Sequence, residues 1–260
     1  MLENINFLHI AMLVCSGVIV GFINTLAGGA STISLNVFMF MGLTPLHASI
    51  ANRIPVLFQT LTSSVIFYRN KMLDIKKSLI YAAPLLVGAV LGAIIAVEVD
   101  RKWFNYALAV MLVIVVFFLL YKPKRWLKGK EAAELKPLNF INGTVFFLMG
   151  LYAGFIYVGM GYFLIITLVL LIGYDLAKAN ANKNFIVLLY TPVLLIVFAL
   201  KAEFDVPMLV FGSIHATGNI IGASIAAKIA ITKGSNFIRY VMVVVSILTA
   251  LQIFGIIKMY

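Results

Sequence analysis

Two cations lie inside long apolar stretches of this chain, and each follows an amide residue: Asn52 precedes Arg53, and Asn182 precedes Lys183. A cation inside a membrane span is costly unless it faces protein, water or an anion, so both cations are candidates for a functional site. Arg53 could hold an oxyanion in a two-pronged fork, and Lys183 could act as a point charge. The alternative is that they reach an interface, or pair with Asp175 or a helix C-terminus.

Asn52 and Asn182 could donate amide hydrogens to an anion or satisfy unwound backbone. Glycines interrupt two apolar runs, at Gly28-Gly29 and at Gly159-Met160-Gly161. Glycine lets a chain unwind at membrane depth, and the N–H groups of a half-helix that starts there favour an anion. We therefore include Gly28, Gly29, Gly159 and Gly161 among the substrate-binding candidates, with a purely steric role as the alternative.

Few residues could carry a coupled proton or a metal. Histidine is the side chain whose ordinary pKa lies nearest neutral pH, so the membrane-associated His47 and His215 are proton-coupling candidates, with a structural role as the alternative. The three histidines are scattered and have no metal-ligand spacing. Every acidic residue is expected to lie in a loop or at the end of a span. The sequence thus predicts no metal site, no cofactor and no catalytic cluster.

The composition indicates an all-α integral membrane protein. The 260-residue chain is 63% hydrophobic and 11% charged, with a mean hydropathy of +1.09, which excludes an ordinary soluble domain. The apolar runs are about 20 residues long and lack the alternation of barrel strands. The net charge of +11 is concentrated between spans, which is typical of membrane topology rather than of nucleic-acid binding.

The chain repeats itself internally. Its first half carries Gly17, Gly21, Gly28, Gly42, Gly88 and Gly92, and its second half carries Gly150, Gly154, Gly161, Gly173, Gly218 and Gly222 with similar spacing. Such self-similarity predicts two structural repeats. We assign residues 1–121 to the first membrane repeat, 122–137 to a basic linker and 138–260 to the second membrane repeat.

Each repeat is expected to hold a glycine-broken helix pair followed by three transmembrane helices, about 8–10 membrane segments in all. The expected segments are 7–26, 33–41, 45–68, 78–97 and 103–121, then 138–157, 163–172, 177–200, 207–230 and 237–257. The first is expected to be retained as a membrane helix rather than cleaved. The two short segments are either re-entrant half-helices or tilted crossings. The Gly-x-x-x-Gly faces could serve packing within one chain or in a homodimer.

Charge counts orient these segments. The linker and the loop holding Arg69, Lys71, Lys76 and Lys77 are rich in Lys and Arg, which places them in the cytoplasm and the N-terminus outside. In the second half the loop equivalent to 69–77 holds Lys201, Glu203 and Asp205 and is net acidic. The halves therefore look inverted. Inverted repeats with broken helices are typical of secondary transporters.

The first half carries the motifs Gly-Phe-Ile-Asn-Thr-Leu-Ala-Gly-Gly-Ala-Ser and Gly-Leu-Thr-Pro-Leu-His-Ala-Ser-Ile-Ala-Asn, and the second half carries Gly-Phe-Ile-Tyr-Val-Gly-Met-Gly and Ala-Asn-Ala-Asn-Lys. Over about residues 10–254 these repeated motifs resemble the sulfite exporter TauE/SafE family of prokaryotic permeases. The resemblance implies a plasma-membrane permease for sulfite, a sulfonate or a related small organic or sulfur oxyanion.

The expected function is secondary transport of a small anion by alternating access of two inverted repeats. Two alternatives remain. A channel-like or cation-moving protein predicts acidic residues or carbonyl rings at its centre. A membrane-embedded enzyme predicts clustered histidines and carboxylates at a membrane face.

Overall fold

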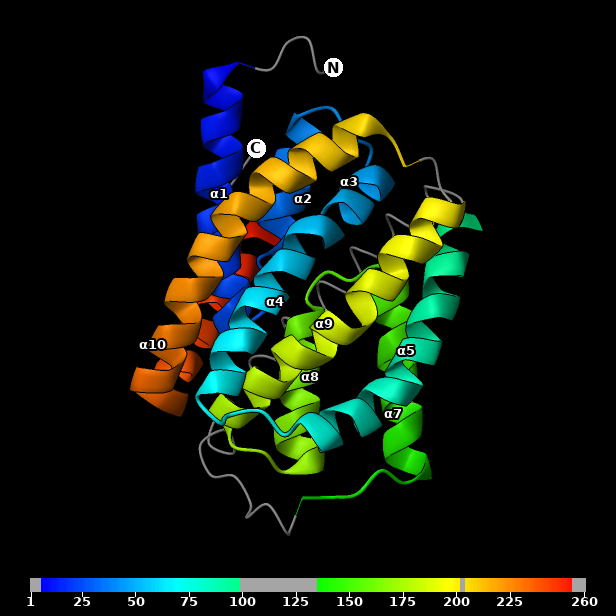
Figure 1. Ribbon diagram of the computed structural model, residues 1–260, viewed down its shortest axis with the longest axis vertical. Coiled ribbons are helices and arrows are strands. Elements are labelled where there is room, and N and C mark those ends of the chain that lie inside the picture. Colours follow the sequence, from blue (N-terminus) through cyan, green and yellow to red (C-terminus); the bar gives the residue numbers. More distant parts are fainter. Residues whose placement is uncertain (1–5, 99–134, 202–203, 254–260) are drawn as a thin grey trace.

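The computed structural model describes residues 6–98, 135–201 and 204–253, with backbone only from 246 onward. Its regular elements in these ranges are all helical (Figure 1). They are α1 (Phe7–Leu26), α2 (Ser31–Phe40), α3 (Pro45–Ala51), α4 (Arg53–Arg69), α5 (Ile75–Glu98), α7 (Phe140–Phe155), α8 (Met160–Ile166), the π-helical η4 (Thr167–Ile172), α9 (Leu176–Lys201) and α10 (Val206–Ile253). The prediction of an all-helical chain is confirmed for the described residues. The expected helix 103–121 and most of the linker lie outside them.

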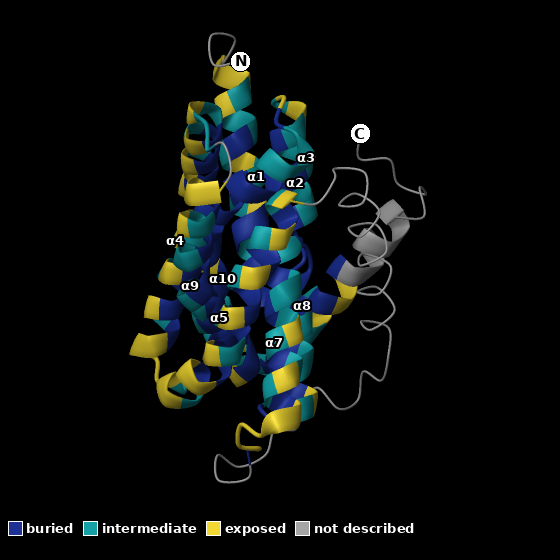
Figure 2. Ribbon diagram, turned by 90° about the vertical axis from the view of Figure 1, so that its right-hand side faces the viewer, coloured by how far each residue is buried: buried dark blue, intermediate teal, exposed yellow. Residues whose placement is uncertain are grey.

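Four described helices are long and apolar enough to cross a membrane: Phe7–Leu26, Ile75–Glu98, Leu176–Lys201 and Val206–Val245. Many residues on the outer surfaces of these helices are exposed (Figure 2). Among them are large apolar side chains, and Ile19, Val87 and Ile196 are each more than half exposed. A surface of this kind is stable against lipid rather than water. The fold is therefore that of a multi-pass helical membrane protein.

Helix boundaries follow local capping chemistry. The Asn6 side chain accepts a hydrogen bond from the backbone N–H of His9 at the start of α1, and Asn139 accepts one from Asn142 at the start of α7. The expected helix 45–68 is divided at Asn52 into α3 and α4. The expected helices 207–230 and 237–257 follow one another within α10, on either side of a kink at Gly234, where the backbone is not helical, with φ of 63° and ψ of −160°.

Two helix pairs pack closely through glycine. The helix α1 packs against α10, and α7 packs against α5. A Cβ atom placed on Gly154 would lie 2.0 Å from the carbonyl oxygen of Ala89, and one on Gly222 would lie 2.1 Å from that of Val18. Only glycine permits such close backbone contact. Each Gly-x-x-x-Gly face thus packs within the chain.

The helices are interrupted at two places in the interior of the protein. The chain leaves the helix between Leu26 and Ser31, and again between Phe155 and Met160. Both breaks contain left-handed residues, with φ of 80° at Gly28 and 75° at Gly159. A Cβ on Gly28 would lie 2.6 Å from the Cα of Gly161, so the two breaks touch backbone to backbone.

Candidate functional site

A small polar cavity lies where the two breaks meet. It is lined by Asn24, Gly28, Gly29, Ser31, Gln59, Thr60, Tyr157, Met160, Gly161, Lys183, Asn184 and Val187. Its volume of about 20 Å³ suits roughly one water molecule. An oxyanion such as sulfite is larger, so the cavity must widen before it can hold one.

Lys183 supplies the positive charge of this cavity. The residue lies on α9 and is buried, and its Nζ donates hydrogen bonds to the carbonyl oxygens of Asn24 at 2.7 Å and Thr25 at 3.2 Å. Both carbonyls belong to the last turn of α1, where the helix dipole favours a cation. An ammonium group has three N–H donors. The third is available to a group in the cavity.

Amide and hydroxyl side chains complete the lining. Asn24 accepts a hydrogen bond from the backbone N–H of Ala30 at 2.8 Å and so ties the end of α1 to the start of α2. The Nδ2 of Asn184 donates to the carbonyl oxygens of Thr25 and Asn180. Among the described residues, the amide oxygens of Asn184 and Gln59 have no hydrogen-bond donor. Buried polar atoms without partners suggest that water or a ligand completes this site.

Arg53 contacts the end of α7, before the second break, as Lys183 contacts the end of α1, before the first. Its Nη2 donates to the carbonyl oxygens of Ala153 at 3.1 Å and Gly154 at 3.0 Å, in the last turn of α7. Its guanidinium carbon lies 5.2 Å from the ring centre of Tyr157 and 4.8 Å from that of Phe198, within cation–π range. Arg53 does not line the cavity. Both cations thus contact a helix C-terminus, and Lys183 alone of the two also reaches the cavity.

The neighbouring amides have separate locations. Asn52 is fully buried at the junction of α3 and α4, and neither of its amide atoms has a partner among the described residues. Asn182 lies instead in a polar cluster with Asp74 and Ser78, outside the cavity. Its oxygen accepts from the Asp74 backbone N–H at 2.9 Å and the Ser78 hydroxyl at 2.7 Å, and its Nδ2 donates to the Lys178 carbonyl at 2.8 Å. Every hydrogen bond of Asn182 is therefore internal to the fold.

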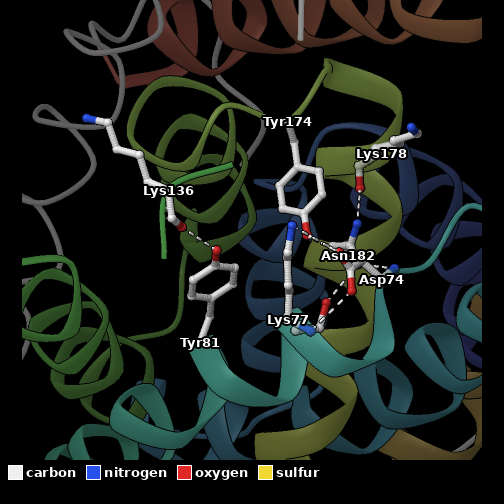
Figure 3. Close-up of polar contacts among 8 residues, drawn as sticks. Asp74, Lys77, Tyr81, Lys136, Tyr174, Lys178 and Asn182 are labelled. Atoms are coloured by element: carbon white, nitrogen blue, oxygen red, sulfur yellow. Dashed lines mark hydrogen bonds and ion pairs between the residues drawn. The ribbon is translucent and has the colours of Figure 1, made fainter. Parts of the chain in front are cut away.

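Figure 3 shows this polar cluster at the junction of α5 and α9. The Tyr174 hydroxyl donates to Asp74 at 3.1 Å, and Lys77 forms an ion pair with Asp74 at 3.8 Å. Burial, and after it the negative charge of Asp74, raise the pKa of Tyr174. A second cavity of about 330 Å³ lies beside the cluster and is lined partly by Lys71 and Lys178. The cluster fastens the loop before α5 to the beginning of α9.

The two histidines differ in burial. His215 is fully buried on α10; its Nδ1 donates to the Leu13 carbonyl at 2.8 Å, and its Nε2 accepts from the Ser34 hydroxyl at 2.9 Å. Both ring nitrogens are thereby satisfied in the neutral form. His47 is partly exposed in the first turn of α3. Neither histidine lines the central cavity.

Of the glycine candidates, Gly28, Gly29 and Gly161 line the cavity, whereas Gly159 caps α8 without lining it. The sequence candidates omitted Ser31, Thr60 and Tyr157, which do line it. The position of Tyr157 beside the second break was a signal that could have identified it. Thr60 offered none, because its side chain reaches the cavity only through the packing of α4.

Together these features define a multi-pass helical membrane protein with a buried, positively charged polar centre. The chain belongs to the Sulfite exporter TauE/SafE family, whose sequence profile matches residues 13–253. Family membership and the names of relatives identify it as a membrane transporter.

Curated relatives match the chain along most of its length. A probable membrane transporter protein of Haemophilus influenzae is 25% identical over 91% of each chain. The probable membrane transporter protein ORF9 of a Sinorhizobium species is 26% identical, over 97% of this chain and 95% of the relative. The probable membrane transporter protein YfcA of Escherichia coli K12 is 25% identical, over 87% and 82%. No solved structure matches the chain.

Proposed function

We propose that this protein is a secondary transporter that moves a small oxyanion, such as sulfite or a sulfonate, across the plasma membrane. The observation that carries the proposal is the cavity at the meeting point of the two helix breaks, with Lys183 beside it. A cation that already neutralises the end of α1 retains one donor for a ligand. Family membership supports the substrate class.

We propose that the chain consists of two inverted repeats, and the helix arrangement supports this. The loop before α5 contacts the turn before α9 through the bond between Tyr174 and Asp74. In the first half, the equivalent turn at Gly42 is separated from that loop by α3 and α4. Equivalent turns thus lie at opposite ends of the helices, as inversion requires. The exchange of contacts, with each cation against the other half's broken helix, supports the same relation.

We propose an alternating-access mechanism, and the small size of the cavity supports it. Because the space fits about one water molecule, an oxyanion enters only if the halves separate around the breaks. We propose that the chain is oriented with its N-terminus outside and its central linker in the cytoplasm, as the charge counts predict.

A cation pathway is the competing function. No acidic residue is among those that line the cavity, as far as the described residues define it, and Lys183 would repel a cation there. The composition of the cavity lining therefore favours an anion over a cation as the transported species.

The test is anion-induced thermal stabilisation of purified protein with sulfite, sulfonates, sulfate, carboxylates and nitrite. A ligand at 100 times its dissociation constant stabilises by about 2.7 kcal/mol. We expect one anion class to raise Tm in the wild type and in Lys178→Ala, an exposed lysine on the same helix, but not in Lys183→Ala. Uptake of that anion by proteoliposomes should be lost in the same variant.

Each variant is compared with its own anion-free Tm, because Lys183→Ala also removes a helix cap. Equal stabilisation of Lys183→Ala and the wild type, or no response to any anion, would contradict the proposed site.

A further inference from the structure

Tyr157 has an unfavourable backbone conformation for a residue with a side chain. Its φ is 70°, in the left-handed region. Gly28 occupies the same place relative to the end of α1, with φ of 80°. Both residues follow the cap of a broken helix, and both donate a backbone hydrogen bond of 3.2 Å to the residue five positions earlier. Glycine would suit this position, so the side chain of Tyr157 requires another explanation.

Tyr157 is close to both the central cavity and Arg53. It lines the central cavity with Lys183, and its ring centre is 5.2 Å from the guanidinium carbon of Arg53. Arg53 is fully buried and does not itself line the cavity. Tyr157 is thus in contact with both the cavity and the cation that the cavity does not reach.

Arg53 retains unused donors. Its Nη2 contacts two carbonyl oxygens, whereas Nε and Nη1 have no hydrogen-bond partner among the described residues. A buried cation with unpaired donors is unfavourable unless something else supplies acceptors. A bound oxyanion has several oxygens and could supply them.

We propose that the Tyr157 side chain controls access from the anion cavity to Arg53. In the closed arrangement described here, the tyrosine ring covers the guanidinium. When the ring moves, the cavity extends to Arg53, and an oxyanion is held by Lys183 on one side and Arg53 on the other. This inference rests on the proposed function and names Tyr157 as a residue that determines access to the second cation.

The test measures access to Arg53 with phenylglyoxal, which modifies guanidinium groups, followed by peptide mass spectrometry. The exposed Arg69 serves as the internal reference. We expect Arg53 in Tyr157→Gly and Tyr157→Asn to react severalfold faster than in the wild type, and Arg53 in Tyr157→Phe to stay slow because the ring is retained. Asparagine also tolerates the left-handed backbone, so Tyr157→Asn removes the ring without straining that conformation.

Phe198→Leu is the matched control, because Phe198 covers the guanidinium without lining the cavity. It should leave the labelling rate of Arg53 unchanged. Equal labelling of Arg53 in the wild type, Tyr157→Gly and Tyr157→Asn would overturn the proposal, as would faster labelling in Phe198→Leu alone. The readout needs no transported anion, so its failure is distinguishable from failure of the proposed function.

Discussion

Each buried cation contacts the two carbonyl oxygens that precede the last residue of a broken helix. Lys183 contacts those of Asn24 and Thr25, before Leu26, and Arg53 contacts those of Ala153 and Gly154, before Phe155. The last carbonyls of a helix lack partners within it and carry partial negative charge. A cation at this position is therefore structural and, where a donor remains free, also available to an anion.

Asn182 should contribute to stability rather than to anion binding. Asn182→Ala removes its bonds to Asp74, Ser78 and Lys178 and leaves buried groups unpaired, which costs about 1–3 kcal/mol. We expect a lower Tm with an unchanged anion-induced shift. Ser78→Ala, which removes a single bond, should lower Tm less. An Asn182→Ala protein that is as stable as the wild type but no longer responds to anions would contradict this role.

Tyr174 should make the protein less stable as the pH becomes alkaline. Its pKa is raised in the folded protein, so its contribution is complete below its ordinary pKa of about 10 and is lost as pH rises above that value. The Tm of the wild type should therefore fall more steeply from about pH 9 to about pH 11 than that of Tyr174→Phe. Parallel pH profiles for the two proteins would show that the hydroxyl bond to Asp74 contributes nothing.

At the scale of elements, glycine determines how closely the helices approach. Gly88 and Gly92 on α5 face the backbone of α7, and Gly150 and Gly154 on α7 face the backbone of α5. Backbones in such contact exclude even a methyl group. The helix pairs that hold the two breaks in place are therefore sensitive to the smallest side chain.

Gly154→Ala should destabilise the fold, since the new Cβ would lie 2.0 Å from the carbonyl oxygen of Ala89. Overpacking of this kind costs about 1–3 kcal/mol. Gly143 is the matched control on the same helix, where the nearest atom would be 3.9 Å away. Gly143→Ala should be neutral or stabilising by about 0.5–1 kcal/mol. Thermal unfolding of both variants in one detergent compares them; a similar loss of Tm in both would contradict close packing at Gly154.

At the scale of the whole molecule, helices of one half pack against helices of the other half. The helix α1 of the first half packs against α10 of the second, α7 packs against α5, and each cation contacts the opposite broken helix. Neither half could therefore bury its polar centre alone. The alternating access proposed above would require the two breaks to separate as the halves move against each other.

Labelling from one side of the membrane tests this arrangement. Lys71 and Lys178 line one cavity and so lie at the same membrane face. Lys201 ends α9, a helix of 26 residues, about 39 Å long at 1.5 Å per residue. In a Cys15→Ser background, an impermeant maleimide should label Lys71→Cys and Lys178→Cys only from the cytoplasmic side, and Lys201→Cys only from outside. Labelling of Lys178→Cys and Lys201→Cys from one side would contradict the crossing of α9.

The sequence by itself determined the helical membrane class and the first helix from Phe7 to Leu26, because apolar length is a local signal. It could not separate Asn182 from Lys183, although one lies in the polar cluster and the other in the central cavity. Adjacent residues on a helix point about 100° apart, and only the packing of α9 against its neighbours decided which of the two faces the cavity. Tertiary structure likewise placed Tyr157 over Arg53, since that contact joins segments about a hundred residues apart.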